Sequence, residues 1–363
     1  MLKPAYKIII GRKFIDTTDE PKASTITDLT VTLDMEAPAD SATLILGNIN
    51  GLQPVRDDDI KISLGYEDDD TMTQVMVGNV VTVEPGLTTK RVVGYSTADR
   101  LLRTFVDQTY ESKTAAQIVR DLVSRASSGG ASSGSASPLG GAIGNAVNNV
   151  LGGEGDRVTL EVATAEDGIT FPAYVVDSQR SAYHHMRDLA DLCGFDLYIN
   201  PAGKLIFEKF VNGKTVHVLE YAKHIITLDI RRSPARATLV EAWGESPGGR
   251  SGEDAWAWLT NDFTHSRGSA GSGTSKFLLE RAALRTAAAA KTAANAALTE
   301  IQRRTLQGRL LIQGNPAIKL GDAIRLTNLP DESLNQIFQV RGVTHHITKI
   351  GGFTTTLEFR SIT

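Results

Sequence analysis

The chain carries a β-rich segment that recurs late in the sequence, and this repeat constrains the fold more than any other feature. The early segment begins with residues 29–33 (LTVTL) and 42–46 (ATLIL), and the late one with residues 228–232 (LDIRR) and 237–240 (ATLV). An internal repeat reveals architecture because each copy is one structural unit. The sequence therefore predicts two similar β-modules in one chain.

The later parts of the two segments also match in order and in character. Each has a strand that begins with aspartate, then a longer strand with a central glycine, and then a strand that begins with threonines. The alternation of apolar and polar residues favours strands that are buried on one face. These strands are residues 59–62, 75–81 and 88–93 in the first copy, and 322–326, 338–343 and 354–359 in the second.

The composition is that of a globular protein: 363 residues, 41% hydrophobic and 22% charged, enough for two or three domains. A net charge of −4 without a basic run argues against nucleic-acid binding. The single cysteine, Cys193, excludes an internal disulfide. No apolar run reaches the ~20 residues that span a bilayer, and residues 1–10 lack a signal-peptide core. These features predict a soluble chain that is made in the cytosol and does not insert into a membrane.

We expect a mainly β fold with an α+β insertion, in which two similar β-barrel modules flank a small α/β domain. Residues 1–103 are almost entirely strand-like and form the first barrel module. Residues 104–215 form the α/β domain, which includes an amphipathic helix over 114–124. Within this domain, residues 126–156 are dominated by Gly, Ser, Ala and Asn, a composition that predicts a flexible insertion.

The α/β domain also contains a second helix, which starts at Ser181 and is followed by a hairpin. Gly194 supplies the left-handed residue that ends this helix. The hairpin pairs residues 195–199 with residues 204–207 across a turn of Asn, Pro, Ala and Gly.

The second barrel module, residues 216–363, is interrupted twice. A Gly/Ser-rich loop is predicted over residues 246–275, and a long Ala-rich helix over 276–303 with Ser275 as its N-cap. Aromatic side chains in a polar loop are either partner contacts, which are enriched in such residues, or are packed against the barrel. The candidate partner-contact residues are Trp256, Trp258 and Phe263.

Candidate catalytic and metal-binding residues are few. His184 is adjacent to His185, and His345 to His346, but neither pair has further ligands at metal-site spacing. Neighbouring residues of a strand point to opposite faces, so the second pair cannot bind one ion together. Cys193 lies on the apolar face of its helix and is interpreted as a core residue. The sequence predicts no metal, no cofactor and no catalytic residue.

Two acidic clusters, residues 57–59 and 67–70, lack the spacing, glycine and closing glutamate of a calcium loop. We interpret them as solvated turns, with the acidic rim of a pore or docking surface as the alternative. No nucleophile elbow, phosphate-binding loop or dinucleotide fingerprint occurs. The chain is therefore predicted not to be an enzyme, although carboxylates that only folding brings together are invisible in a sequence.

One stretch resembles a known family. Residues 183–198 (YHHMRDLADLCGFDLY) and 203–207 (GKLIF) are similar to a segment of phage tail hub proteins. This group comprises hubs of the late control D type and the N-terminal hub half of VgrG-type spike proteins. Residues 314–322 (GNPAIKLGD) resemble the family's entry to its last barrel strands, and residues 340–347 with 352–357 resemble its closing hairpin.

The resemblance implies a structural baseplate hub of a contractile phage tail or of a tail-like injection machine. Such hubs are homotrimers with a pseudo-sixfold ring of barrels that adapts a hexameric tail tube to a trimeric spike. The implied partners are the tube protein, the spike protein and other baseplate proteins. The resemblance also implies assembly in the bacterial cytoplasm and a final place in a virion tail or an injection-particle baseplate. Since the sequence ends at Thr363 without a β-helical region, we expect the spike to be a separate protein.

Two other classes of function stay open at this point. A baseplate-associated cell-wall hydrolase would need convergent carboxylates or a metal site in a cleft. A tail-tip module that binds a carbohydrate or a receptor would need only the surface of the β-modules.

Overall fold

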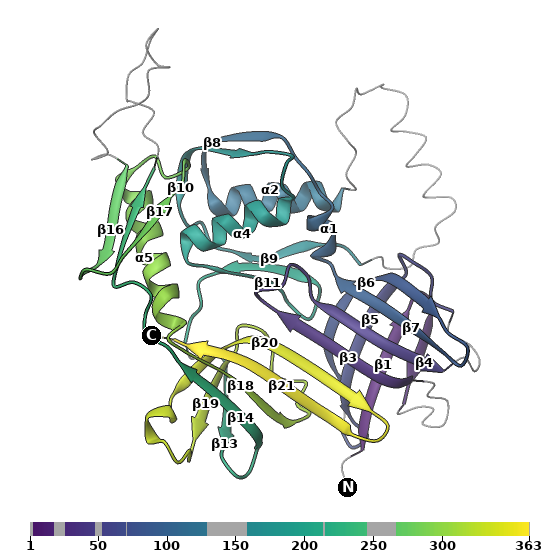
Figure 1. The fold of residues 1–363 in the computed structure, drawn as a ribbon. Helices are drawn as coiled ribbons and strands as arrows, with labels where there is room; N and C mark the ends of the chain where they lie inside the picture. The colour runs from purple at the N-terminus through teal and green to yellow at the C-terminus, as the bar shows by residue number, and fades with distance from the viewer. Residues whose placement is uncertain are drawn as a thin grey trace, which may run out of the picture.

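The computed structural model describes residues 3–17, 26–47, 53–69, 71–128, 158–212, 215–244 and 266–362. It confirms a mainly β fold with an α+β insertion. The two strand-rich modules lie side by side, and the helical part lies across one end of them (Figure 1). The described residues include no helix that is both long and apolar enough to cross a membrane.

The first module is a curled sheet whose strands follow the order β3-β4-β7-β6-β5-β1-β2. Its apolar residues alternate along each strand, as the sequence predicts for a sheet that covers a core on one face. The strands are β1 (Pro4–Ile10), β2 (Lys13–Asp16), β3 (Ile26–Asp34), β4 (Ser41–Gly47), β5 (Asp59–Tyr66), β6 (Thr73–Pro85) and β7 (Thr89–Ser96).

The second module repeats this order. Its path β14-β18-β21-β20-β19-β13 matches β3-β4-β7-β6-β5-β1 strand for strand, except that β13 runs parallel to β19 whereas β1 is antiparallel to β5. A short 3-10 helix (Glu332–Leu334) lies between β19 and β20. The strands are β13 (Val216–Glu220), β14 (Ile225–Arg232), β18 (Leu306–Gln313), β19 (Ala323–Thr327), β20 (Ile337–Thr348) and β21 (Gly352–Ser361).

Irregularities of the two modules fall at equivalent positions. The β3–β4 ladder shifts register between Ile26 and Asp28, and the β14–β18 ladder shifts between Ile225 and Thr227. Counting from these bulges aligns residues 29–33 with 228–232, which is the match visible in the sequence. A bulge at the same place in both ladders supports a true repeat of structure, because alternation of residues alone does not place a bulge.

The loops that precede β5 and β19 are also alike. The Asp58 carboxylate accepts a hydrogen bond from the Val55 amide (2.9 Å), and the Asp322 carboxylate accepts one from the Lys319 amide (3.0 Å). Asp57 and Gly321, the residues just before these aspartates, both have positive φ angles, 69° and 81°. The structure thus aligns Asp58 with Asp322.

One element of the sequence match is wrong. Residues 239–243 form β15 (Leu239–Trp243) in a separate small sheet, and the counterpart of β4 is β18. The order of this sheet is β16-β15-β17, and in the chain it is inserted between β14 and β18 of the second module. Residues 237–240 resemble β4 in sequence because they have the same alternation of apolar and polar residues, although β18 is its structural counterpart.

The predicted loop over 246–275 and helix over 276–303 also need correction. Residues 267–271 form β16 (Arg267–Gly271), and residues 276–280 form β17 (Lys276–Glu280), which pairs with β15 in parallel. Helix α5 spans Ala287–Arg303, and its N-cap is Thr286, whose hydroxyl accepts from the Ala289 amide (3.2 Å). Ser275 cannot cap a helix there because its carbonyl accepts hydrogen bonds from the amides of Thr238 and Leu239.

The α/β domain contains the predicted helices and hairpin. A capping box at Thr114 starts α2, and the left-handed Gly194 (φ 71°) ends α4. Two small sheets, β10-β8 and β11-β12-β9, pack with these helices. The elements are α1 (Asp99–Leu102), β8 (Gln108–Thr114), α2 (Ala115–Ser127), β9 (Glu161–Ala165), β10 (Thr170–Val176), α4 (Ala182–Cys193), β11 (Asp196–Ile199) and β12 (Lys204–Glu208).

Some sequence predictions lie outside the described residues. These include the candidate contacts Trp256, Trp258 and Phe263, and residues 129–156 of the predicted insertion. The first residues of that insertion, 126–127, belong to helix α2.

The modules are joined into one 13-stranded sheet, because β20 of the second module pairs with β3 of the first. The ladder is antiparallel and runs from Gly342 opposite Asp34 to Thr348 opposite Asp28. One hydrophobic core lies under both modules, with Leu29 and Val31 of β3 and Val343 and Leu357 of the second module in it. A second core lies between the α/β domain and α5.

The two repeats differ in how deeply equivalent strands are buried, which predicts different costs of truncation. Leu29 of β3 is fully buried, whereas its counterpart Leu228 of β14 is only partly buried. Leu29→Ala should lower the free energy of unfolding by about 3 kcal/mol, and Leu228→Ala by about 1 kcal/mol. Urea unfolding of the monomeric chain measures both. Equal losses would contradict the view that β14 is an incompletely covered strand.

Candidate functional site

The two modules and the helical part meet at Glu36, in the loop that follows β3. Its carboxylate is 2.8 Å from a guanidinium nitrogen of Arg341 on β20 and 3.1 Å from one of Arg360 on β21. Arg187 of α4 (3.7 Å) and Arg304, which follows α5 (3.6 Å), approach the same carboxylate. One side chain of the first module thus binds the second module and both helices.

The surrounding arginines keep the Glu36 carboxylate ionised well below the pH at which an ordinary glutamate takes up a proton. Burial alone would raise the pKa of Glu36, but the guanidinium groups of Arg360 and Arg341 outweigh it and lower the pKa to about 2. Its exposed fraction is about one third, 35% of the side chain, so water screens part of the attraction.

Two further carboxylates complete the ion-pair cluster around Glu36. Asp196, at the start of β11, binds the guanidinium of Arg341 and the side-chain amide of Gln339. Glu300 of α5 binds Arg360 (2.9 Å) and Arg304 (2.6 Å). Each arginine therefore has a carboxylate partner, and each carboxylate is held by at least one cation or amide. Such a cluster fixes geometry because removal of one member leaves a buried charge unpaired.

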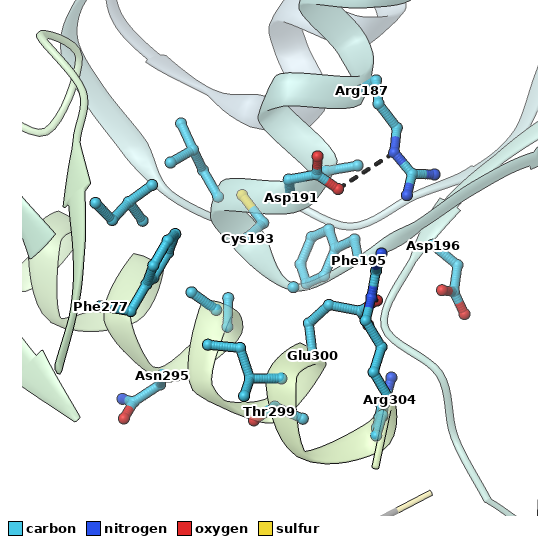
Figure 2. A pocket seen from close by; sticks show the side chains of 18 of the residues that line it. Arg187, Asp191, Cys193, Phe195, Asp196, Phe277, Asn295, Thr299, Glu300 and Arg304 are labelled. Atoms are coloured by element: carbon cyan, nitrogen blue, oxygen red, sulfur yellow. Dashed lines mark hydrogen bonds and ion pairs between the residues drawn. The ribbon is translucent and has the colours of Figure 1, made fainter. Parts of the chain in front are cut away.

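A pocket of about 860 Å³ opens beside this cluster, between α4 and α5 (Figure 2). Asp191 points into it and is paired with Arg187 at 3.2 Å. Phe277 of β17 and Asn295 of α5 line the opposite side. The wall is therefore mixed: at one end the Arg236 guanidinium lies over the Phe277 ring at 4.4 Å, and at the other end ion pairs line the pocket.

The Cys193 thiol in the pocket wall is poorly suited to act as a nucleophile. Burial raises the pKa of the Cys193 thiol to about 11, and its sulfur accepts a hydrogen bond from the Ile169 amide at 3.4 Å. A nucleophilic cysteine needs the opposite shift, toward a stable thiolate. Glu300 is held by two arginines, so its carboxylate is already engaged in ion pairs. Cys193 thus has the core position that the sequence predicts.

The two histidines of each pair contact different groups. His345 is buried in β20 with its Nδ1 3.0 Å from the Thr355 hydroxyl, and burial lowers its pKa to about 4. His346 points to the other face and lies 3.1 Å from Asp28. On α4, the His184 ring is 2.8 Å from the Ser181 hydroxyl, and the His185 ring contacts the Asp177 carbonyl. No cluster of three metal-binding side chains occurs among the described residues.

Asp57, Glu67 and Asp68 of the two acidic clusters lie in turns. Asp59 accepts a hydrogen bond from the Asn79 side chain, Asp69 accepts one from the Tyr66 amide (2.8 Å), and Glu67 pairs with Lys3 (3.0 Å). Short loops between antiparallel strands commonly use aspartate in this way, because its carboxylate satisfies backbone amides that the ladder leaves free.

Two strand edges stand out because the repeat leads one to expect a neighbour. Among the described residues, β14 lies at the end of the sheet and pairs with β18 alone, and residues 82–85 of β6 pair with β7 alone. The equivalent segments, β3 and the C-terminal half of β20, pair with each other. An exposed edge presents unpaired backbone groups that another strand can bind.

Two hairpin tips are a further surface feature. Leu87, between β6 and β7, and Ile350, between β20 and β21, are both fully exposed. They lie at equivalent places in the repeat, at the ends of their hairpins. The opposite ends of these hairpins contact the helical part, since Thr97 donates to the Gly203 carbonyl (2.7 Å) and Arg303 to that of Ile362 (3.4 Å). Both tips therefore lie on the side of the modules away from the helices.

No family model matches this sequence, and no curated protein matches it either. Solved structures do. The chain is similar to the 43 kDa tail protein of prophage MuSo2 from Shewanella oneidensis, at 12% identity and a TM-score of 0.66 over 98% of each chain. It is also similar to a tail protein from Neisseria meningitidis MC58, at 13% identity and a TM-score of 0.65 over 99% of this chain and 96% of that one.

A third similar structure comes from a secretion machine. It is the E. coli c3393 protein, a component of the type VI secretion system with structural similarity to T4 tail proteins gp27 and gp5. The identity is 10%, the TM-score 0.56, and the match covers 97% of this chain and 76% of that one. The resemblance to the tail hub group that the sequence predicts is thus confirmed at the level of the fold.

The ion-pair cluster predicts a pH-dependent contribution to stability. Glu36→Gln should lower the free energy of unfolding by about 2 kcal/mol at pH 7, after allowance for the exposed third of the side chain. Because the folded pKa is below the unfolded one, this contribution is complete above pH 4.5 and is lost as the pH falls toward 2. Urea unfolding at pH 7 and pH 3 measures it. Glu67→Gln is the matched control and should change stability much less, because Glu67 has a single ion-pair partner, Lys3, whose side chain is 70% exposed.

Proposed function

We propose that this protein is a structural hub in the baseplate of a contractile phage tail or of a tail-like injection machine. The fold is shared with phage tail proteins and with a type VI secretion component over nearly the whole chain. The assembled form in this proposal is a homotrimer. Its role is mechanical: it joins a tail tube to a spike and to other baseplate proteins, and it carries no catalytic activity.

The repeated module is the observation that carries this proposal. Two copies with the same strand order and the same bulges give one chain two nearly equivalent positions in a ring. Three chains then supply six equivalent positions, which suits a sixfold tube, while the chain count still suits a trimeric spike. Contacts of this head-to-tail kind form a closed ring when the rotation between modules divides the circle.

The hairpin tips are the proposed contact with the tube. A trimer would present six tips, each with one exposed apolar residue, Leu87 or Ile350. Six equivalent tips match six tube subunits, whereas a trimeric spike would find only three of each kind. The spike is accordingly placed at the helical side, which has threefold but no sixfold character.

The proposal is tested by negative-stain electron microscopy of the purified chain, alone and with the candidate spike protein. The expected image is a threefold ring with six similar lobes around a central channel. Monomers in both preparations would overturn the proposal. A parallel peptidoglycan digestion assay examines the hydrolase alternative, for which we expect no activity.

The tube contact can be tested separately. Leu87→Ser with Ile350→Ser should weaken co-sedimentation with assembled tube by about tenfold or more, because each substitution removes apolar area from each of three copies. Ring formation should persist, since both side chains are exposed at hairpin tips. Val55→Ser, at an exposed residue of the loop before β5, is the control and should leave tube binding unchanged. Unchanged binding of the double variant would exclude the tips as the tube contact.

A further inference from the structure

We infer that β14 of one protomer pairs with the C-terminal half of β6 of the next protomer, in an antiparallel ladder with a defined register. The partner is a second copy of this chain. The inference rests on the proposed trimer and specifies its interface. The internal β3–β20 ladder supplies the template, since it joins the two modules of one chain in the way that the new ladder would join two chains.

The internal ladder can serve as a template because its two strands, β3 and β20, have β14 and β6 as their equivalents in the other module. β6 and β20 each shift register against their hairpin partner at the same point, between Val80 and Thr82 and between Val340 and Gly342. This shift aligns Thr82 with Gly342. On the other side, the shared bulge of β3 and β14 aligns residues 28–34 with residues 227–233.

The transferred register places oppositely charged residues together. In the internal ladder Thr344 lies opposite Thr32, so Glu84 of one chain lies opposite Arg231 of the next. Glu84 also lies opposite Arg91 on its own β7, at 3.2 Å. The new ladder would complete a row of Arg91, Glu84 and Arg231 across three strands, a favourable arrangement because opposite charges on neighbouring strands attract.

The apolar side of the ladder is also consistent. Ile230 and Leu228 replace Val31 and Leu29 and keep their apolar character. They are only partly buried in one chain, whereas Val31 and Leu29 are fully buried under the internal ladder. β14 thus has the same apolar positions as β3 but lacks the neighbouring strand that buries them in β3.

Residues 82–85 of β6 show the same contrast. Gly342, Val343 and His345 of β20 are buried where β3 covers the strand, while Thr82, Glu84 and Pro85 of β6 are exposed. Two of the differences between equivalent positions change an apolar or hydrogen-bonding group of the ladder: Pro85 replaces His345, and Arg232 replaces Leu33. Proline removes one possible backbone donor, and it is tolerated at sheet edges for that reason. Arg232, on the same face of β14 as Leu228 and Ile230, is held by the Asp331 carboxylate at 3.4 Å.

Ladders of this kind close the assembly. Each chain contributes the strands β14, β18, β21 and β20 and the strands β3, β4, β7 and β6, which are consecutive in the sheet. Three chains joined from β6 to β14 form one closed barrel of 24 strands, from eight strands in each of three chains. A closed barrel removes every edge in that path, which a monomer leaves exposed.

The register is tested with cysteine pairs in the full chain. Residues directly opposite in an antiparallel ladder have Cα atoms about 4.5–5.5 Å apart, within the range of a disulfide. Glu84→Cys with Arg231→Cys should therefore give covalent dimers and trimers after mild oxidation, on non-reducing gels. Native Cys193 is buried and should contribute no background.

The matched control shifts the pair by two residues on the same face. Glu84→Cys with Asp229→Cys places the cysteines about 7–8 Å apart on the diagonal and should cross-link far less. Each single variant should remain uncross-linked. Rings without cross-links in the first pair, or stronger cross-links in the shifted pair, would overturn the register and leave the proposed hub intact. Absence of rings for the unmodified chain would overturn the hub itself.

A charge exchange gives a second measurement that needs no oxidation. Arg231→Glu should weaken trimer formation by about tenfold or more, because like charges then face each other in each of three interfaces. Glu84→Arg combined with Arg231→Glu should recover a substantial part of that loss. Mass photometry over a dilution series measures both. Equal trimer stability of all three proteins would contradict the proposed pairing.

Discussion

The ladder between β3 and β20 is the contact on which the arrangement of the two modules depends. It makes one sheet out of two repeats and places a single hydrophobic core beneath both. The loop after β3 continues the contact, since the Met35 amide donates to the Arg341 carbonyl at 3.0 Å. Glu36 then binds side chains from β20, β21 and α4, and that of Arg304 just after α5. Backbone pairing thus sets the angle between the modules, and the ion pairs fix the helical part against it.

The interrupted second module shows how a large insertion can be accommodated in a repeat. The small sheet of β15, β16 and β17 and the helix α5 lie between the counterparts of β3 and β4. Their apolar residues join the core of the α/β domain and not that of the modules. The insertion therefore leaves strand order unchanged, because it is folded on a different core. The Ala-rich face of α5, with Ala290 and Ala293 fully buried, permits the close approach of β16 that this packing needs.

Patterns among neighbouring residues could be predicted from the sequence, whereas contacts between residues far apart in the chain could not. The alignment of Leu29 with Leu228 could be predicted because apolar alternation is a property of neighbouring residues. The assignment of β18 could not, since residues 237–240 have the same alternation and lie closer in the chain. Residues 276–286 were predicted as helix from composition, whereas pairing with β15 makes their first part a strand. Glu36 and Arg360 are separated by 324 residues, so no spacing rule could connect them.

The unequal burial of equivalent strands has a physical explanation at the level of an assembly. A duplicated module that folded for itself alone would be expected to cover the apolar residues of both copies to the same extent. Here one edge pair is joined inside the chain, while the other, β14 and residues 82–85 of β6, keeps apolar residues and complementary charges without cover. The pairing between chains that we infer would account for that difference, because the same complementarity would then act once within the protomer and once between protomers.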